Sequence, residues 1–382
     1  MRIVKSLFFA STFLASTLTA AKADVNVVTS LKPIHSLVSA VMEGVGEPTL
    51  IVEGAGSPHA YALKPSQAQS LESADVVFWV GDELEAFLEK PLQTIAANAK
   101  SVALIDAHDL IKLKFRDGGA FDDHGHEEKG HDDHGHEKKA KADHDDHGHD
   151  DHGHEKKAKA DHDDHGHDDH GHEKKAKAGH DDHGHDDHGH EKKAKAGHDD
   201  HGHDDHGHEG FDPHIWLDPI NAKALVHEIE EVLSEKDPTH AAQYEANAKA
   251  LESKLDRLVA DVSTELKPLH DKGFIVFHDA YQYFEKRFDI KASGSITISP
   301  EILPGAERVS EIQGKIKQLG VTCVFAEPQF EPKLVSTVIE GTKAKSGVID
   351  PLGAALEKGP DQYFQLIRNM ATSIKKCLTE LT

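Results

Sequence analysis

The chain has 382 residues, of which 37% are hydrophobic, so it contains enough apolar sequence for one or two soluble domains. Its 68 acidic residues outnumber its 43 basic ones and give a formal net charge of −25. That balance excludes a basic surface over the chain as a whole, and we therefore expect no nucleic-acid partner.

The first 23 residues have the features of a secretory signal peptide. Arg2 and Lys5 precede an apolar run that begins at Leu7, and small residues occupy positions Ala21 and Ala23. The A-x-A spacing predicts cleavage after Ala23. A membrane anchor is disfavoured because the apolar run is short and interrupted by Ser and Thr. The mature protein, from residue 24 onward, is expected in an exported, oxidising compartment.

Short runs of β-branched and aromatic residues alternate with helical patterns on both sides of a long polar tract. They begin at residues 25, 74 and 102 before the tract, and at residues 274, 321 and 347 after it. Near-continuous apolar strands followed by helices predict parallel sheets with both faces covered. The expected fold class is α/β with two lobes. The N-terminal lobe is predicted to comprise residues 24–121 and 210–237, and the C-terminal lobe residues 268–382.

The polar tract, residues 122–209, contains 25 of the 33 histidines and no Leu, Ile, Val, Phe, Tyr or Trp. Its 29 acidic and 13 basic residues contribute −16 to the net charge. Without apolar burial to offset chain entropy, we predict that it is disordered. It repeats every 18 residues, and each full copy carries five histidines that we interpret as low-affinity metal ligands, such as His144, His147, His149, His152 and His154. They are expected to bind weakly because the chain must order itself around each ion.

A long helix is predicted over residues 238–267. Five apolar residues fall on one helical face, with charged residues on the others: Leu251, Leu255, Leu258, Val262 and Leu266. Roughly 28 helical residues at 1.5 Å per residue span about 42 Å. We expect it to join the two lobes rigidly, and the alternative is an unusually long helix within one lobe.

The chain has two cysteines, Cys323 and Cys377. In an oxidising compartment we expect a disulfide between them. The alternative is a pair of unrelated buried thiols. A zinc site built on these cysteines is not expected, because the C-x-x-C spacing is absent.

Four polar side chains follow predicted strands or strongly apolar segments. They are His59 after "TLIVEGAGSP", His214 within "DPHIWLDP", His278 after "FIVF" and Asp350 after "GVI". Ligands in open α/β sheets bind at the carboxyl ends of the strands, so we expect these four to meet in the cleft between the lobes. Neutral imidazole suits zinc, and four ligands complete a tetrahedron. A structural, hydrogen-bonded histidine is the alternative for each one alone, but together they predict a Zn²⁺ site.

Other polar residues are weaker candidates. Glu327 lies at the end of a predicted strand and is either a hydrogen-bond partner of a ligand or a residue without a role in the site. His35 and His108 are expected to be structural rather than metal ligands.

The segments "SPHAYALKPSQAQSLESADVVFWVGDELEAFL", "DPHIWLDP", "FHDAYQYFEKRF", "SPEILPGAERVSEI", "CVFAEPQFEP" and "IDPLG" occur in this order, with the histidine-rich tract after the first. This succession resembles the zinc-binding periplasmic component of high-affinity zinc ABC importers, a cluster A-I solute-binding protein. The resemblance covers nearly the whole mature chain outside the tract. It implies two α/β lobes joined by a rigid helix, with metal in the interlobe cleft.

The resemblance also implies individual residue roles. It maps the three histidine ligands of the family to His59, His214 and His278, and a carboxylate ligand of several relatives to Asp350. Manganese-binding relatives typically carry Glu in place of the third histidine, so His278 favours zinc. Some zinc-binding members have Glu directly before the first ligand, whereas this chain has Pro58, which leaves Asp350 or a water as the fourth ligand. The family also supports the pairing of the two cysteines.

We therefore expect a periplasmic monomer that binds Zn²⁺ with high affinity and passes it to an inner-membrane ABC permease with a cytoplasmic ATPase. ATP chemistry is assigned to the partner because this chain has no GxxxxGK[ST] motif. The alternatives are a free-standing periplasmic zinc buffer and a zinc-dependent hydrolase. We expect no enzymatic activity, since the chain contains no HExxH. The tract is expected to capture or buffer zinc for the cleft, or else to be a tolerated loop expansion.

Overall fold

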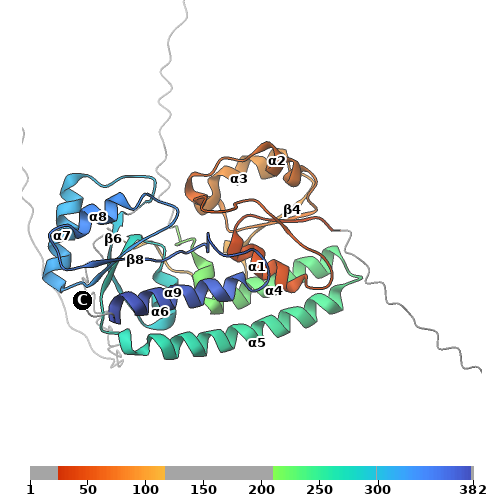
Figure 1. Cartoon of the computed structure of the whole chain (residues 1–382). Coiled ribbons are helices and arrows are strands. Elements are labelled where there is room, and N and C mark those ends of the chain that lie inside the picture. Colours follow the sequence, from red (N-terminus) through yellow and green to blue (C-terminus); the bar gives the residue numbers. More distant parts are fainter. Residues whose placement is uncertain (1–24, 117–209, 298, 380–382) are drawn as a thin grey trace, which may run out of the picture. The chain divides into compact units, whose positions relative to one another are not determined.

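The computed structural model describes residues 25–116, 210–297 and 299–379 (Figure 1). The predicted signal peptide, residues 1–23, lies outside the described residues. So does the predicted tract, residues 122–209, with the five histidines 144, 147, 149, 152 and 154. None of the helices within the described ranges has the length and apolar character needed to cross a bilayer.

The first sheet is built from the residues before the tract. Its four parallel strands, in the order β2-β1-β3-β4, are β1 (Val27–Thr29), β2 (Thr49–Leu50), β3 (Val76–Trp79) and β4 (Lys100–Ala103). Every residue of β1 and β3 is buried, as expected for parallel strands covered on both faces. The helical segments of this part are α1 (Lys32–Val41), η1 (Pro58–Ala60), α2 (Pro65–Glu72), α3 (Asp82–Thr94) and η2 (Leu104–Asp106).

The second sheet is built from residues after the tract. Its four parallel strands, in the order β6-β5-β7-β8, are β5 (Phe274–His278), β6 (Ala292–Thr297), β7 (Cys323–Ala326) and β8 (Lys345–Val348). The helices that alternate with them are α6 (Gln282–Phe288), α7 (Ala306–Leu319) and α8 (Lys333–Ile339). Two parallel sheets flanked by helices confirm the predicted fold class. β6, with the sequence ASGSIT, was not predicted because it has no continuous apolar run.

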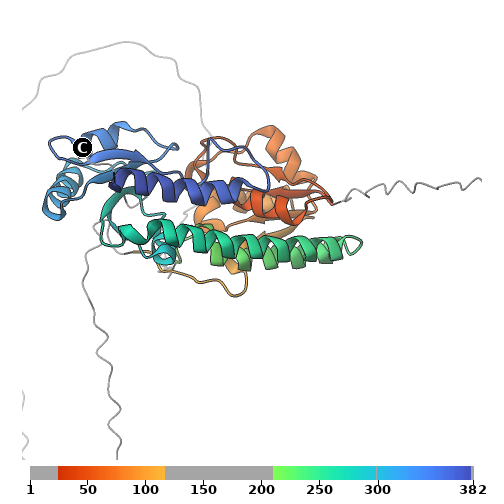
Figure 2. The same cartoon turned by 60° about the horizontal axis from the view of Figure 1, so that its bottom comes forward.

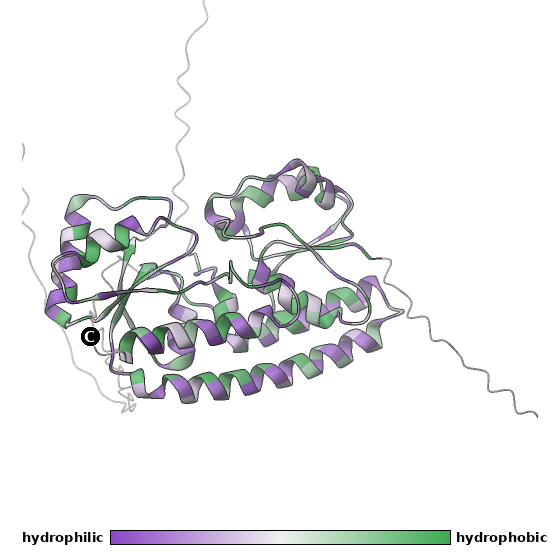
Figure 3. Cartoon of the chain, viewed as in Figure 1, coloured by the Kyte–Doolittle hydropathy of each residue, from purple (hydrophilic) through white to green (hydrophobic). Residues whose placement is uncertain are grey.

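Four further helical segments accompany the sheets: η3 (Ile215–Leu217), α4 (Pro219–Lys236), α5 (Ala241–Leu266) and η4 (Lys267–Leu269). The C-terminal helix is α9 (Gln362–Thr379). α5 packs against α4, α1 and α9, and Figures 1 and 2 both show it running alongside α4. Its amphipathic character is visible as alternating colours in Figure 3.

The long helix was predicted from its apolar stripe, and all five residues of that stripe are buried: Leu251, Leu255, Leu258, Val262 and Leu266. α5 contains 26 residues and begins at Ala241, three positions after the predicted start at residue 238. The reason is local: the backbone N–H of His240 donates to the carbonyl oxygen of Asp237 at 3.1 Å and closes a turn before the helix. The exact boundaries of the two lobes stay a prediction.

Cys323 and Cys377 form the expected disulfide, with their Cα atoms 6.0 Å apart. It connects β7, inside the second sheet, to α9. α9 also contacts α1 and α5, so this cross-link ties the second sheet to helices that pack together beside the first.

Glu85 is a buried carboxylic acid in α3, with none of its surface exposed. Its Oε2 accepts the backbone N–H groups of Val80 at 2.6 Å and Gly81 at 3.3 Å, where β3 gives way to the helix. Burial raises the pKa of Glu85 from its ordinary 4.5 to about 7, although the hydrogen bonds from the backbone N–H groups of Val80 and Gly81 act in the opposite direction. The fold therefore favours the protonated form of this side chain.

Replacing Glu85 with Gln is expected to increase the free energy of unfolding relative to the parent, and this increase should be larger at pH 8 than at pH 5. The pKa is higher in the folded than in the unfolded state, so stability is lost as the pH rises from 4.5 through about 7. Gln is neutral throughout, and the gain relative to the parent should reach up to about 3 kcal/mol. Urea unfolding at both pH values measures it, with the exposed Glu89→Gln on the same helix as control. A stability difference independent of pH would contradict the prediction.

Candidate metal centre

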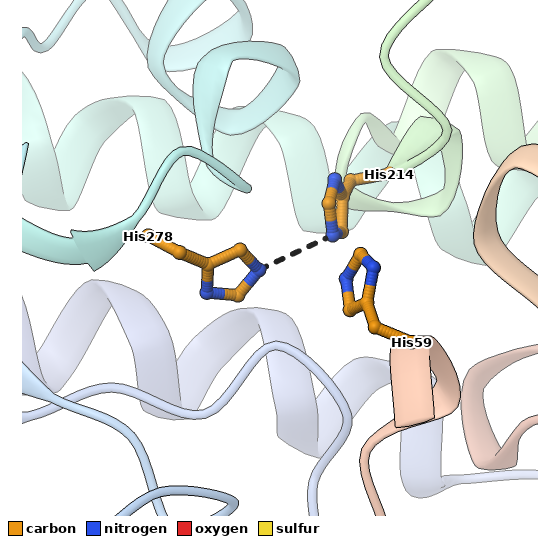
Figure 4. Close-up of side chains that lie close together, drawn as sticks. All are labelled: His59, His214 and His278. Atoms are coloured by element: carbon orange, nitrogen blue, oxygen red, sulfur yellow. Dashed lines mark hydrogen bonds between the residues drawn. The ribbon is translucent and has the colours of Figure 1, made fainter. Parts of the chain in front are cut away.

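Three histidines from distant parts of the chain converge on one point (Figure 4). His59 lies in η1, His214 directly precedes η3, and His278 is the last residue of β5. Their ring centroids are 5.5 Å apart for His59 and His214, 5.5 Å for His59 and His278, and 5.3 Å for His214 and His278. The structure thus brings together the three imidazoles that were predicted as ligands.

The spacing of the ring nitrogens suits one shared metal ion. Each of the three histidines offers one nitrogen, and these three atoms all lie within 4.8 Å of one another. The Nε2 atoms of His214 and His278 are 3.4 Å apart, the contact drawn as a dashed line in Figure 4. Two nitrogens bound to the same tetrahedral zinc ion lie about 3.3 Å apart. This pair therefore already has the separation that coordination of zinc requires.

The cavity next to the three rings is very small. Its volume is about 10 Å³, and it is lined by the three histidines together with Trp216, Glu327 and Phe330, among others. This is about the volume that one water-sized group needs.

Two of the histidines are held by carboxylates through the ring nitrogen that does not face the other rings. Asp212 Oδ1 lies 2.7 Å from Nδ1 of His214 and also accepts that residue's backbone N–H at 2.9 Å. Glu327 Oε1 lies 2.8 Å from Nδ1 of His278. A carboxylate on Nδ1 fixes the proton there, so that the lone pair of Nε2 is available to a metal.

The cluster favours neutral imidazoles at two of its three positions. Burial, followed by repulsion from His214 and His278, lowers the pKa of His59 to about 3. Burial and the neighbouring His278 also lower the pKa of His214 well below 6.5. Burial acts in the same direction on His278, but the charge and hydrogen bond of Glu327 outweigh it and raise its pKa. Metal coordination requires the neutral form, which most of this site already prefers.

Asp350, the predicted carboxylate ligand, is not among the residues that the structure brings together. Its Oδ1 accepts the backbone N–H groups of Leu352 and Gly353, both at 3.0 Å, and the side-chain amide of Gln329 at 2.9 Å. These bonds use the carboxylate to hold the turn that follows β8. Within the described ranges, the group with metal-ligand spacing consists of the three histidines.

Several other residues around the site had been considered or missed. His35, expected to be structural, is buried in α1 with Nε2 3.1 Å from the carbonyl oxygen of Pro48. Asp212 was missed, although a carboxylate two residues before a candidate ligand was a usable signal. Asp279, next to His278, is bound by Arg116, whose Nε lies 2.8 Å from its Oδ2. The carboxylate that directly follows the candidate ligand His278 is thus engaged in an ion pair with Arg116.

A family model described as the periplasmic component A of the zinc-uptake complex (ZnuA) matches residues 27–377. The chain belongs to this zinc-uptake family. The resemblance inferred from its motifs is thereby confirmed.

Relatives of known name cover nearly the whole length of the chain. A high-affinity zinc uptake system protein ZnuA from Brucella suis biovar 1 is 54% identical over 382 residues, 100% of both chains. The protein of the same name from Yersinia pestis is 32% identical over 356 residues, 93% of this chain and 92% of its own. A crystal structure of ZnuA has a TM-score of 0.63 at 21% identity, covers 93% of this chain and 100% of its own, and shows the same fold.

Replacing Glu327 with Ala is expected to weaken zinc binding by about 10–100-fold, as is typical when a carboxylate that orients a histidine ligand is lost. The change leaves the Nδ1 of His278 without the partner that fixes its proton. Competition with a chromogenic chelator measures the dissociation constant. The exposed Glu331→Ala serves as control, and equal affinities for the two variants would show that Glu327 does not orient the ligand.

Proposed function

We propose that this chain is the periplasmic Zn²⁺-binding component of an ABC importer, and that His59, His214 and His278 bind the ion. The observation that carries the proposal is the convergence of three imidazole nitrogens to within 4.8 Å from three separate segments. Membership of the ZnuA family supports zinc as the ion transported. Asp350 or a water completes the coordination.

High affinity is expected because the site is prepared before the ion arrives. Two carboxylates fix the proton positions of their histidines, and the three ring nitrogens already lie within 4.8 Å of one another. Little ordering therefore opposes binding, which leaves more of the coordination free energy as affinity. Three neutral nitrogen donors also suit Zn²⁺ better than they suit Mg²⁺, Ca²⁺ or Mn²⁺, which prefer oxygen ligands.

Delivery requires a membrane permease and a cytoplasmic ATPase, and we assign both to partner proteins. We propose that the chain acts as a monomer and is exported by residues 1–23, with cleavage after Ala23. The segments on either side of the site belong to different sheets, so the permease can open the site by separating them. α5, which is 26 residues long, resists a wide hinge motion, and the opening is therefore modest.

The histidine-rich tract is proposed to supply zinc to this site, and the points at which it joins the described residues support that role. Lys114 and Phe211 form an antiparallel bridge, and the N–H of Asp212 donates to the carbonyl oxygen of Leu113 at 2.8 Å. The two attachment points, Lys114 and Phe211, thus lie close together, and Phe211 is three residues before His214. A pocket of about 460 Å³ there is lined by Phe115, Arg116, Pro213 and the three site histidines. Ions released at the attachment points enter beside the metal centre.

A zinc-dependent hydrolase remains less well supported than a binding protein. Hydrolysis needs a carboxylate or histidine free to act as a general base on zinc-bound water. The carboxylates Asp212, Glu327 and Asp279 are each paired with a histidine or an arginine. The same pairing supports a site built to hold an ion.

Metal analysis of protein lacking residues 122–209 tests the proposed site. The parent deletion variant should retain one tightly bound zinc per chain after dialysis, and His59→Ala, His214→Ala and His278→Ala should each lose it. Asp350→Asn separates the two candidates for the fourth ligand, since the amide oxygen can still accept hydrogen bonds from the turn while the anionic ligand is lost. Unchanged zinc content in all three histidine variants would eliminate the site.

Zinc binding by the tract is expected to collapse on mild acidification. Its 25 histidines have an ordinary pKa of about 6.5, so their protonation between pH 7.5 and pH 5 takes the charge of the tract from −16 towards +9. Protons and zinc compete for the same nitrogens. Zinc titrations of the full chain and the deletion variant at both pH values give the tract stoichiometry by difference. Equal stoichiometry at the two pH values is the contrary outcome.

A further inference from the structure

The three site histidines differ in one respect. His214 and His278 each have a carboxylate within hydrogen-bonding distance of Nδ1, at 2.7 Å and 2.8 Å. The Nδ1 of His59 also faces a carboxylate, Glu301 Oε1, but across 3.7 Å. That distance is too long for a hydrogen bond and is about 1 Å from an ordinary one. His59 therefore faces a carboxylate, as the other two histidines do, but forms no hydrogen bond with it.

Glu301 is presented by the loop between β6 and α7. The loop leaves β6 at Thr297, which is paired in register with His278 on β5. The hydroxyl of Thr297 donates to the carbonyl oxygen of Ile302 at 2.9 Å and so pins the loop just beyond Glu301. The hydroxyl of Ser299 donates to the other carboxylate oxygen, Oε2, which leaves Oε1 directed at His59.

The surroundings of His59 indicate which nitrogen is free for a metal. Its Nε2 is buried and has no hydrogen-bond partner among the described residues. The Glu301 side chain is 33% exposed, whereas that of His59 is 17% exposed. His59 comes from the segment that follows β2 of the first sheet, and Glu301 comes from the loop that follows β6 of the second sheet. Their contact therefore spans the two halves of the site.

We propose that Glu301 is the positioning residue of His59. When zinc binds, Nε2 coordinates the ion and Nδ1–H donates to Glu301 Oε1, so that each of the three ligands is held by its own carboxylate. This inference rests on the proposed zinc site. It makes the β6–α7 loop part of that site, and closure of the third pair joins the halves of the site only when the ion is present.

The test is the rate of zinc release from the full-length protein into excess chelator. The slow phase of release reports the preformed site. Glu301→Ala is expected to accelerate that phase about 10–100-fold. Glu301→Gln should stay within about threefold of the parent, because the amide oxygen still accepts Nδ1–H and the lost charge is partly screened by solvent. Glu307→Ala, an exposed acidic residue at the start of α7, is the matched control.

Thermal unfolding of the zinc-free variants separates positioning from folding, and equal midpoints for parent, Ala and Gln variants are expected. An unaltered slow phase in Glu301→Ala overturns the proposal while leaving the zinc site intact. Release from Glu301→Gln as fast as from Glu301→Ala also overturns it, since the hydrogen bond is then not the source of the effect. A parent slow phase that survives His278→Ala overturns the zinc site itself, and the inference with it.

Discussion

The hydrogen bond between Nδ1 of a buried histidine and a carboxylate is the constraint on which the candidate metal centre depends. An imidazole removed from water resists protonation, yet its own N–H still needs an acceptor. Asp212 and Glu327 supply that acceptor at Nδ1, the ring nitrogen that does not face the other rings. The Nε2 atoms of His214 and His278 are then left facing each other at 3.4 Å, a separation at which one zinc ion can bind both.

The rest of the fold serves to bring three sequence-distant rings to this arrangement. Trp216, fully buried beside His214, donates from its indole nitrogen to the carbonyl oxygen of Pro351 at 2.9 Å, and Tyr363 donates to the carbonyl oxygen of Trp216 at 2.7 Å. Nζ of Lys32 at the start of α1 donates to the carbonyl oxygens of Ala354 and Leu356. Segments that follow the second sheet thus pack directly against those that follow the first.

Much of this architecture was predictable because it depends on local patterns. Apolar runs indicated β1, β3, β4, β5, β7 and β8, and the leucine stripe indicated α5. β6 escaped notice because its burial comes from neighbouring elements, while its own sequence is rich in Ser and Gly. A strand of this kind is specified by tertiary contacts more than by its composition.

The metal centre was predictable only in part. His59, His214 and His278 stand in recognisable motifs at the ends of apolar segments, so their convergence followed from topology. Asp350 stands in an equally recognisable place, and its carboxylate accepts hydrogen bonds within its own turn, so its role as a fourth ligand stays a prediction. Orientation of this kind cannot be read from spacing. Glu301 and His59 are 242 residues apart in the sequence (301 less 59), and no sequence periodicity predicts that their side chains face each other.

The antiparallel bridge between Lys114 and Phe211 pairs the residues that precede the histidine repeat in sequence with those that follow it. Both ends of the insertion are therefore fastened by the folded body, whatever the number of 18-residue units between them. Because the entropy of closing a loop grows only with the logarithm of its length, adding or losing a unit costs well under about 1 kcal/mol. Duplication or deletion of repeats is thus expected to leave the geometry of the three-histidine group unchanged.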